Sequence, residues 1–112
     1  MKISLVTPCF QAARFIRETI ESVLAQQGAE VEYGIADGAS SDGTVEIIRP
    51  YEARLAWWFS EPDRGQTDAL NKAFARTTGD VLSFLNADDV LLPGALACVA
   101  AAFQENPALD IV

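Results

Sequence analysis

Short apolar runs alternate along the chain with segments in which apolar residues recur every three or four positions. The short runs are rich in branched or aromatic side chains, which predicts buried strands over 2–7, 31–36, 55–60 and 81–85. The periodic segments predict helices over 12–27, 44–51, 67–77 and 94–104. Residues 109–112 begin a further apolar run. This alternation predicts an α/β fold with a mostly parallel sheet and helices on both faces.

Local features refine two of these elements. Pro8 is expected to end the first strand, and Gly28 is expected to follow the first helix as a stop. Trp57 and Trp58 are adjacent in a predicted strand and therefore point to opposite faces of the sheet. One indole is then expected in the core, and the other needs a different partner, such as a covering helix.

The composition agrees with a packed domain and restricts its partners. Of the 112 residues, half are apolar and 21% are charged, and 8 Lys and Arg against 16 Asp and Glu give a net charge of −8. This acidic balance argues against a general affinity for nucleic acid and against a polybasic membrane-surface module, both of which need a basic face. The chain contains no histidine, which excludes Ser-His-Asp catalysis and histidine-containing zinc sites. Cys9 and Cys98 are expected to be reduced thiols in the core.

No segment predicts export or insertion into a membrane. The first apolar run is too short for a signal peptide, and the run over 90–103 contains Pro93 and Gly94 and falls short of the about 20 residues of a membrane span. We therefore expect no transmembrane segment and a cytoplasmic location. Because a new apolar run starts at residue 109, we expect the chain to be the front part of a larger domain.

Acidic residues follow three of the four predicted strands, and in an open parallel sheet ligands bind at that edge. The adjacent carboxylates of Asp88 and Asp89 repel each other unless a cation or hydrogen bonds hold them. A Mg²⁺ or Mn²⁺ ion, with diphosphate oxygens completing its shell, would satisfy both. A turn or helix cap formed by the same aspartates is an open alternative.

The other polar residues at this edge also have two interpretations. Asp37, in a turn that contains glycine, can accept a hydrogen bond from a ligand, or it can form an Asx turn with Asp42 as a helix cap. Arg64 and Asp68 can contact a nucleotide, whereas Asp68 is also explained by the dipole of its helix. Dinucleotide and Walker-type sites are excluded, because the chain has neither G-x-G-x-x-G nor a Walker lysine loop.

Four segments, taken in order, resemble the family-2 glycosyltransferases of the GT-A fold. They are SLVTPCFQAARFIRETIESVLAQ, DGASSDGT, EPDRGQTDALNKA and GDVLSFLNADD, and they span essentially the entire chain. The resemblance implies a Rossmann-like nucleotide-binding half. It also implies a nucleoside-diphosphate sugar as donor, first of all a UDP-sugar, and inverting transfer to an unidentified acceptor in cell-envelope polysaccharide or glycoconjugate synthesis.

The resemblance further assigns residues to the nucleoside. It places the base of the sugar nucleotide against Thr7, Pro8, Phe10 and Asp37. Asp68 would contact the nucleoside or ribose region. Phe10 stands where many family members have tyrosine, so stacking is retained while a hydroxyl contact is lost.

The metal-binding element implied by the resemblance is of the DxD type and falls on Asn86-Ala87-Asp88. Asn86 keeps an oxygen acceptor at the first position but carries no charge. Asp88 is then the first ligand for Mn²⁺ or Mg²⁺, and Asp89 is the second. The ion would stabilise charge on the departing nucleoside diphosphate.

The family's catalytic base is expected beyond residue 112, and neither Asp63 nor Asp89 is assigned to that role. The chain is thus expected to be the nucleotide-sugar-binding part of a GT-A domain, truncated at its C-terminus and inactive alone. A non-catalytic nucleotide-binding module and a purely structural domain are the alternatives, and the second predicts no binding of nucleotide or metal. An uncovered sheet edge predicts self-association as a homodimer.

Overall fold

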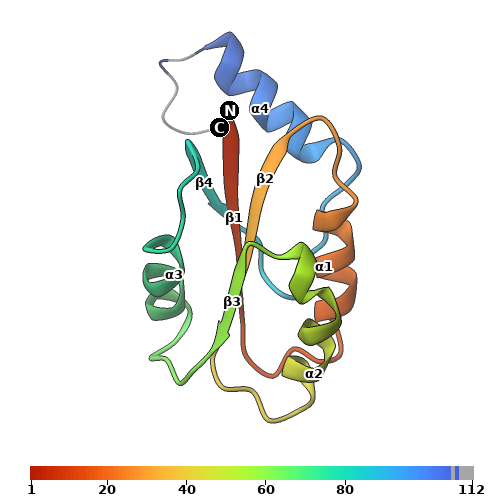
Figure 1. Cartoon of the computed structure of the whole chain (residues 1–112), viewed down its shortest axis with the longest axis vertical. Helices are drawn as coiled ribbons and strands as arrows, with labels where there is room; N and C mark the ends of the chain where they lie inside the picture. The colour runs from red at the N-terminus through yellow and green to blue at the C-terminus, as the bar shows by residue number, and fades with distance from the viewer. Residues whose placement is uncertain (107, 109–112) are drawn as a thin grey trace.

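The computed structural model describes residues 1–106 and 108, in which helices follow strands in regular alternation (Figure 1). The predicted run over 109–112 lies outside the described residues. The elements in chain order are β1 (Lys2–Cys9), α1 (Ile16–Leu24), β2 (Glu30–Asp37), α2 (Thr44–Ile48), the 3-10 helix η1 (Arg49–Arg54), β3 (Trp57–Ser60), α3 (Gln66–Phe74), β4 (Val81–Phe84) and α4 (Ala95–Glu105).

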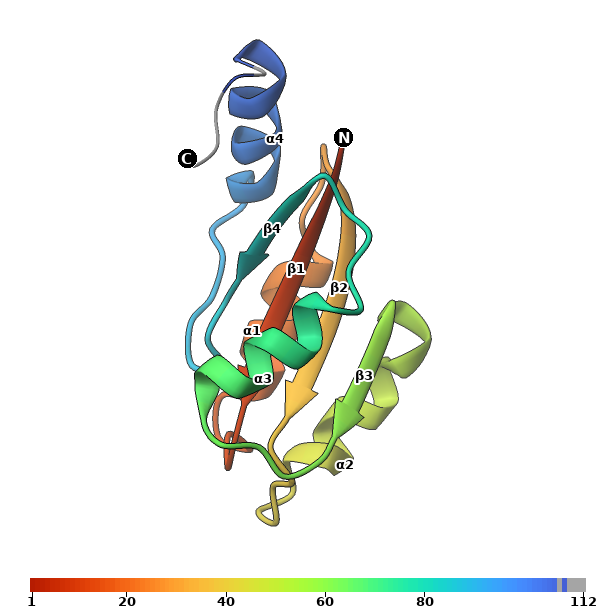
Figure 2. The same ribbon diagram turned by 90° about the vertical axis from the view of Figure 1, so that its left-hand side faces the viewer.

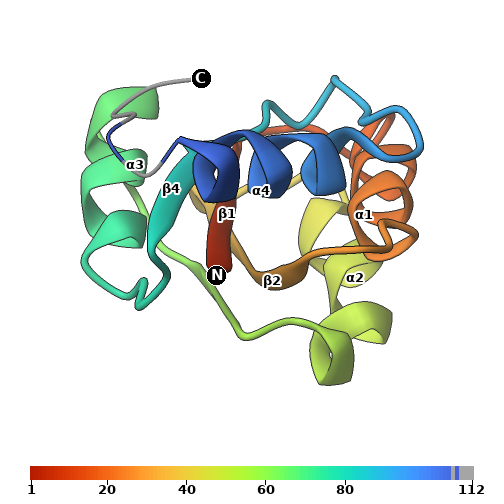
Figure 3. The same cartoon turned by 90° about the horizontal axis from the view of Figure 1, so that it is seen from above.

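The four strands form one parallel sheet in the order β3-β2-β1-β4. Helices α1 and α2 lie on one face and α3 on the other, which confirms the predicted α/β architecture (Figures 2 and 3). After β3 the chain crosses the sheet to add β4 beside β1, so the strand order reverses between β1 and β4. In an open sheet the carboxyl ends of the strands at such a reversal form a crevice in which ligands bind.

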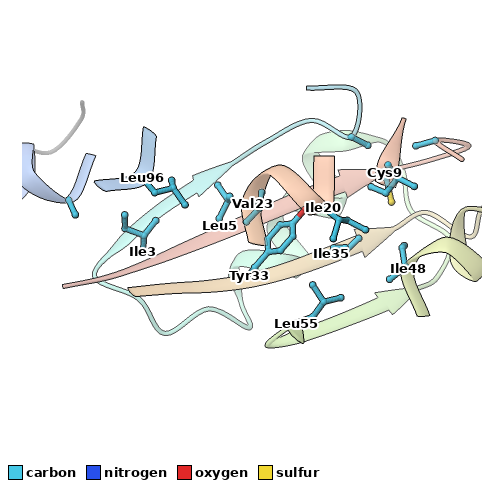
Figure 4. Close-up of a cluster of buried hydrophobic side chains, with 14 residues drawn as sticks. Ile3, Leu5, Cys9, Ile20, Val23, Tyr33, Ile35, Ile48, Leu55 and Leu96 are labelled. Carbon is cyan, nitrogen blue, oxygen red and sulfur yellow. The ribbon is translucent and has the colours of Figure 1, made fainter. Parts of the chain in front are cut away.

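The core has one cluster of buried side chains on each face of the sheet. The larger cluster joins β1 and β2 to α1, and in Figure 4 its side chains meet around Tyr33. Leu96 of α4 closes it near Ile3, at the amino ends of the strands. The smaller cluster lies beneath α3 and contains small residues, which let this helix approach the sheet closely: Val6, Ala36, Ala69 and Ala73.

The two tryptophans of β3 divide between the two faces, as predicted. Trp57 packs with the cluster beneath α3, where its indole lies across Gly34; a Cβ on that glycine would come within 2.2 Å of the ring. Trp58 packs against the larger cluster and donates from Nε1 to Glu52 Oε1 at 2.9 Å. The covering element for Trp58 is thus η1.

The first helix is shorter than the predicted 12–27. At its start, the backbone N–H groups of Ala12 and Ala13 donate to Thr44 Oγ1 and Asp42 Oδ2, which fixes these residues in a turn before Ile16. At its end, Gln26 N donates to the Val23 carbonyl, three residues back, and the helix stops at Leu24. Side chains distant in sequence therefore set the start of this helix.

The predicted helix over 44–51 divides in two. Regular α2 ends at Ile48, and the chain continues as the 3-10 helix η1, with Pro50 in its first turn. Proline carries no N–H for the helical hydrogen bond and so favours this break. Asp42 Oδ1 accepts from Thr44 N at 3.1 Å in an Asx turn that leads into α2, but the N-cap is Gly43, so the predicted cap role of Asp42 is wrong.

Pro8 does not end the first strand, which was predicted to stop at Thr7. It pairs with Ala36 of β2, and β1 continues to Cys9. The Val6 carbonyl oxygen accepts from Leu85 N, so the backbone groups of Val6 point toward β4. Pro8 is two residues further along β1, and its backbone therefore points to the same side. Because β4 ends at Phe84, no residue of β4 pairs with Pro8. The missing proline N–H therefore costs the sheet no hydrogen bond.

Two surface features complete the description of the fold. Cys9 is buried, but Cys98 is exposed on α4, so its predicted place in the core is wrong; Leu96 and Ala100 form the inward side of that helix. Leu82 and Phe84 of the edge strand β4 are 52% and 46% exposed.

In the part of the chain that the structure describes, no helix has the length and apolar character to cross a membrane.

Candidate functional site

Two adjoining hollows lie at the carboxyl ends of the strands. The first, the Asp63 hollow, has a volume of about 400 Å³ and is lined by Pro8, Cys9, Phe10, Gly38, Asp63, Gly65, Gln66 and Ala69. The second, the Asp88 hollow, measures about 430 Å³ and is lined by Pro8, Cys9, Phe10, Gln11, Ala12, Phe15, Gln66, Asn86, Ala87 and Asp88. Because they share four residues, the two hollows form one trough between β2 and β4.

Phe10 and Gln66 stand where the two hollows meet. The Phe10 ring follows β1 and is 65% exposed, which leaves an aromatic surface open to a ligand. Gln66 begins α3 directly after Gly65, whose φ of +114° is a conformation that favours glycine. Its Nε2 donates to Asn86 Oδ1 at 3.1 Å and so ties the start of α3 to the loop after β4.

Polar side chains of α1 hold the loop that carries Asp88. The Thr19 hydroxyl is buried and lies 2.8 Å from the carbonyl oxygen of Ala87 and 2.6 Å from that of Asp89. One turn further on, Ser22 Oγ accepts from Leu91 N at 3.0 Å. The position of the candidate metal-binding loop is therefore set by a helix about 70 residues earlier in the chain.

The predicted metal ligands differ in their placement. Asp88 is exposed and lines the Asp88 hollow beside Asn86. Asp89 is also exposed but does not line that hollow, and its N–H closes a turn onto the Asn86 carbonyl at 3.1 Å. No group of three or more Asp, Glu, Cys or His able to hold a metal occurs among residues 1–106 and 108.

Asp88 and Asn86 nevertheless fit a hard divalent cation. Both offer oxygen atoms, the donor type that Mg²⁺ and Mn²⁺ prefer. Mg²⁺ commonly takes only one or two carboxylates from the protein and completes its shell with substrate phosphates and water. The site can therefore supply the protein's part of such a shell, with Asp88 as its charged ligand.

Asp37 and Thr7, expected to contact the base, are both fully buried. The Asp37 carboxylate accepts from Ser40 N, Ser40 Oγ, Ser60 Oγ and the Cys9 thiol. Burial, together with the neighbouring Asp37, raises the pKa of that thiol and keeps it protonated as a donor. Thr7 Oγ1 lies 2.7 Å from Tyr33 Oη inside the core. Neither side chain lines a hollow, and their ligand contacts remain predictions.

Arg64 and Asp68 also lie outside the lining of both hollows. Asp68 Oδ2 accepts from Arg64 N at 2.9 Å and lies 3.5 Å from Lys72 Nζ. The Arg64 N–H and, after it, the Lys72 ammonium lower the pKa of the Asp68 carboxyl. In this arrangement Asp68 closes the loop before α3, and a nucleotide contact for either residue stays a prediction.

The trough thus combines five predicted residues with others that the sequence interpretation did not select. Pro8, Phe10, Asn86, Ala87 and Asp88 line it as expected. The additional residues Asp63 and Gln66 lie in the segment that follows β3, so their position after a strand could have identified them from the sequence. Thr19 gave no such signal, because it reads as an ordinary residue of an amphipathic helix.

Comparison with known proteins assigns the chain to a family. Residues 4–112 match the family model of Glycosyl transferase family 2. The chain belongs to this family. TuaG of Bacillus subtilis, a putative teichuronic acid biosynthesis glycosyltransferase, is 37% identical over 90 residues, which cover 78% of this chain and 36% of TuaG. The chain spans about a third of the length of several curated relatives that it matches.

Solved structures of glycosyltransferases share the fold of this family member. Staphylococcus aureus TarS (residues 1–349), in complex with UDP-GlcNAc, superposes with a TM-score of 0.86 at 25% identity over 96% of this chain and 32% of TarS. The mannosyltransferase PcManGT of Pyrobaculum calidifontis, with GDP-Man and Mn²⁺, gives a TM-score of 0.82 at 25% identity over 93% of this chain and 32% of PcManGT. The predicted GT-A fold is thereby confirmed.

Proposed function

We propose that the trough binds a nucleoside-diphosphate sugar, with UDP-sugars as the first donors to test. The observation that supports this most strongly is the pair of adjoining hollows, one with an exposed aromatic ring at its border and the other with Asp88. A nucleotide has a flat base at one end and a diphosphate at the other, and the trough offers an aromatic ring where its hollows meet for the first and the Asp88 carboxylate for the second. The UDP-GlcNAc complex of TarS supports the choice of donor.

We propose Asp88, assisted by Asn86, as the protein ligand of a Mn²⁺ or Mg²⁺ ion next to the diphosphate. When bound, the ion would neutralise charge that develops on the departing nucleoside diphosphate. Phe10 would cover the nucleoside, while Gln66 and Thr19 hold the surrounding loops in place. Mn²⁺ in the PcManGT complex is a further reason to test this metal first.

For the whole protein we propose inverting transfer of the sugar to an acceptor in cell-envelope polysaccharide or glycoconjugate synthesis. The likeness to TuaG supports this process. We place the base that deprotonates the acceptor outside these 112 residues, so that this chain alone would bind a donor without transferring its sugar. The cytoplasmic location stays a prediction.

Calorimetric titration with UDP, with and without Mn²⁺, tests the donor site on the 112-residue chain. We expect Mn²⁺-dependent binding that weakens at least about tenfold in Asp88→Ala, because an anionic ligand of the ion is lost. Glu105→Ala is the control, since Glu105 is an exposed carboxylate at the end of α4 and lines neither hollow. A well-folded chain that binds no UDP, GDP, CDP or ADP would refute the proposed donor site and favour a purely structural domain.

Self-association is a separate proposal. Leu82 and Phe84 are exposed on β4, whose outer edge has no strand partner among the described residues. Unpaired edges with apolar side chains favour pairing with a second copy. Light scattering is expected to give a dimer mass that shifts toward the monomer in Phe84→Lys, and a monomeric wild-type chain would contradict the proposal.

A further inference from the structure

If the proposed donor site is correct, some group in the trough must recognise the base, and Asp37 has no capacity left to do so. Asp37 Oδ1 accepts from Ser40 Oγ at 2.6 Å and Cys9 Sγ at 3.3 Å, and Oδ2 accepts from Ser40 N at 2.9 Å and Ser60 Oγ at 2.7 Å. Each carboxylate oxygen has two lone pairs, so these four donors use all of them. The fully buried carboxylate joins β1, β2 and β3 rather than facing the trough.

Asp63 has the opposite arrangement. It is half-buried, lines the Asp63 hollow, and accepts a hydrogen bond only through Oδ1, from Gly65 N at 2.9 Å. Among residues 1–106 and 108, no donor reaches its Oδ2. This oxygen lies over Gly38, where a Cβ would come within 2.7 Å of it. One oxygen thus fixes the side chain, and the other remains available to a ligand.

The position of Asp63 in the trough corresponds to the base end of a bound nucleotide. With the diphosphate beside Asp88, the nucleoside extends past Phe10 and Gln66, which line both hollows. The base then lies in the Asp63 hollow, where the exposed Phe10 ring can stack on it. The free carboxylate oxygen of Asp63 is the charged acceptor in the lining of that hollow.

We propose that Asp63 is the residue that determines base specificity, by accepting a hydrogen bond from a ring N–H of the base. A carboxylate only accepts, so it favours uracil, with its N3–H, and guanine, with its N1–H. Cytosine N3 and adenine N1 are acceptors, which repel a carboxylate at this position, so these bases could pair with it only by shifting to present an exocyclic amino group. A site built to bond a ligand N–H rejects analogues that lack it, because its own polar group is then unsatisfied.

The test is a comparison of UDP with CDP in calorimetric titrations of the 112-residue chain with Mn²⁺. The wild-type chain is expected to prefer UDP by about tenfold or more, the size of one hydrogen bond to a charged group. In Asp63→Asn this preference should fall by about tenfold, because an amide can donate to cytosine N3. Glu61→Gln is the control, because Glu61 lies two residues away, pairs with Lys72 and lines neither hollow. The Glu61→Gln chain should prefer UDP over CDP as strongly as the wild type does.

A second variant perturbs the Asp63 carboxylate without changing residue 63. Gly38→Ala keeps every charge but places a methyl group against Asp63 Oδ2, so it should also reduce the preference for UDP. Circular dichroism confirms that each variant is folded, and Gly38→Ala provides the test if Asp63→Asn does not fold.

The outcomes separate this inference from the proposed function on which it rests. A reduced preference in both variants supports the role of Asp63. Nucleotide binding with an unchanged UDP-to-CDP ratio in Asp63→Asn, or a ratio that changes only in Asp37→Asn, would overturn the inference and leave the donor site in place. Absence of nucleotide binding by the wild-type chain would overturn both.

Discussion

The two ends of the sheet carry the same kinds of polar residue but use them differently. At the amino end, Glu32 accepts from Thr78 N, Thr78 Oγ1 and Ser4 Oγ, and lies 3.6 Å from Lys2 Nζ. At the carboxyl end, Asp88 is exposed and faces a hollow. The carboxylates are chemically alike, so the difference lies in how many protein donors surround each one. We call a carboxylate saturated when protein donors surround its oxygens, as in Glu32, and open when they do not, as in Asp88. Saturated carboxylates stabilise the fold, whereas open carboxylates are available to a ligand.

Asp37 shows that position at the carboxyl edge does not make a carboxylate open. It ends β2, at the edge where the trough lies, yet it is as enclosed by protein donors as Glu32. The relevant distinction is therefore between saturated and open carboxylates rather than between two ends of a sheet. Substitutions of the two kinds should affect different measurements.

The largest effect on stability is expected at Asp37. Asp37→Ala leaves the buried donors of Ser40, Ser60 and Cys9 without their acceptor, which should lower the free energy of unfolding by about 3 kcal/mol or more. Urea denaturation followed by circular dichroism measures this loss. A variant as stable as the wild type would show that Asp37 does not hold the strands together.

A smaller effect is expected at Glu32. The Thr78 N–H, with further hydrogen bonds from Thr78 Oγ1 and Ser4 Oγ and the nearby Lys2 ammonium, lowers the pKa of Glu32 from 4.5 to about 2. Glu32→Gln should therefore cost about 1–2 kcal/mol at neutral pH. Glu30→Gln, an exposed position on the same strand, is the control and should change stability by less than about 0.5 kcal/mol.

The lowered pKa of Glu32 also fixes the direction of the pH dependence. The folded chain releases this proton more readily than the unfolded chain, so the stabilisation is complete above the unfolded pKa of 4.5 and is lost as the pH falls toward about 2. In urea titrations, the difference between wild type and Glu32→Gln should narrow over this range. A constant difference down to pH 2 would contradict the assignment.

The smallest effect on stability is expected at Asp88. Because Asp88 is exposed and its side chain accepts no hydrogen bond from the described residues, Asp88→Ala should change the free energy of unfolding by less than about 0.5 kcal/mol while it weakens Mn²⁺-dependent nucleotide binding. The same urea titration measures the first quantity. A loss comparable to that of Asp37→Ala would place Asp88 among the saturated carboxylates instead.

The sequence by itself determined the succession of strands and helices along the chain, the parallel α/β fold, and the loop that carries Asn86 and Asp88. These follow from local information, namely the period of apolar residues and the segments that resemble the family. The reversal of strand order beside β1 then brings the predicted residues Pro8, Phe10 and Asp88 to one trough.

Only the tertiary structure decided which polar side chains remain open. Asp37 is saturated by Ser60, 23 residues away, and Thr19 holds the Asp88 loop from 68 and 70 residues away. Asp63 faces the trough because Gly38 leaves room for its carboxylate. Hydrogen-bond partners so distant in the chain leave no trace in local periodicity, and it is these partners that separate a carboxylate of the fold from a carboxylate of the site.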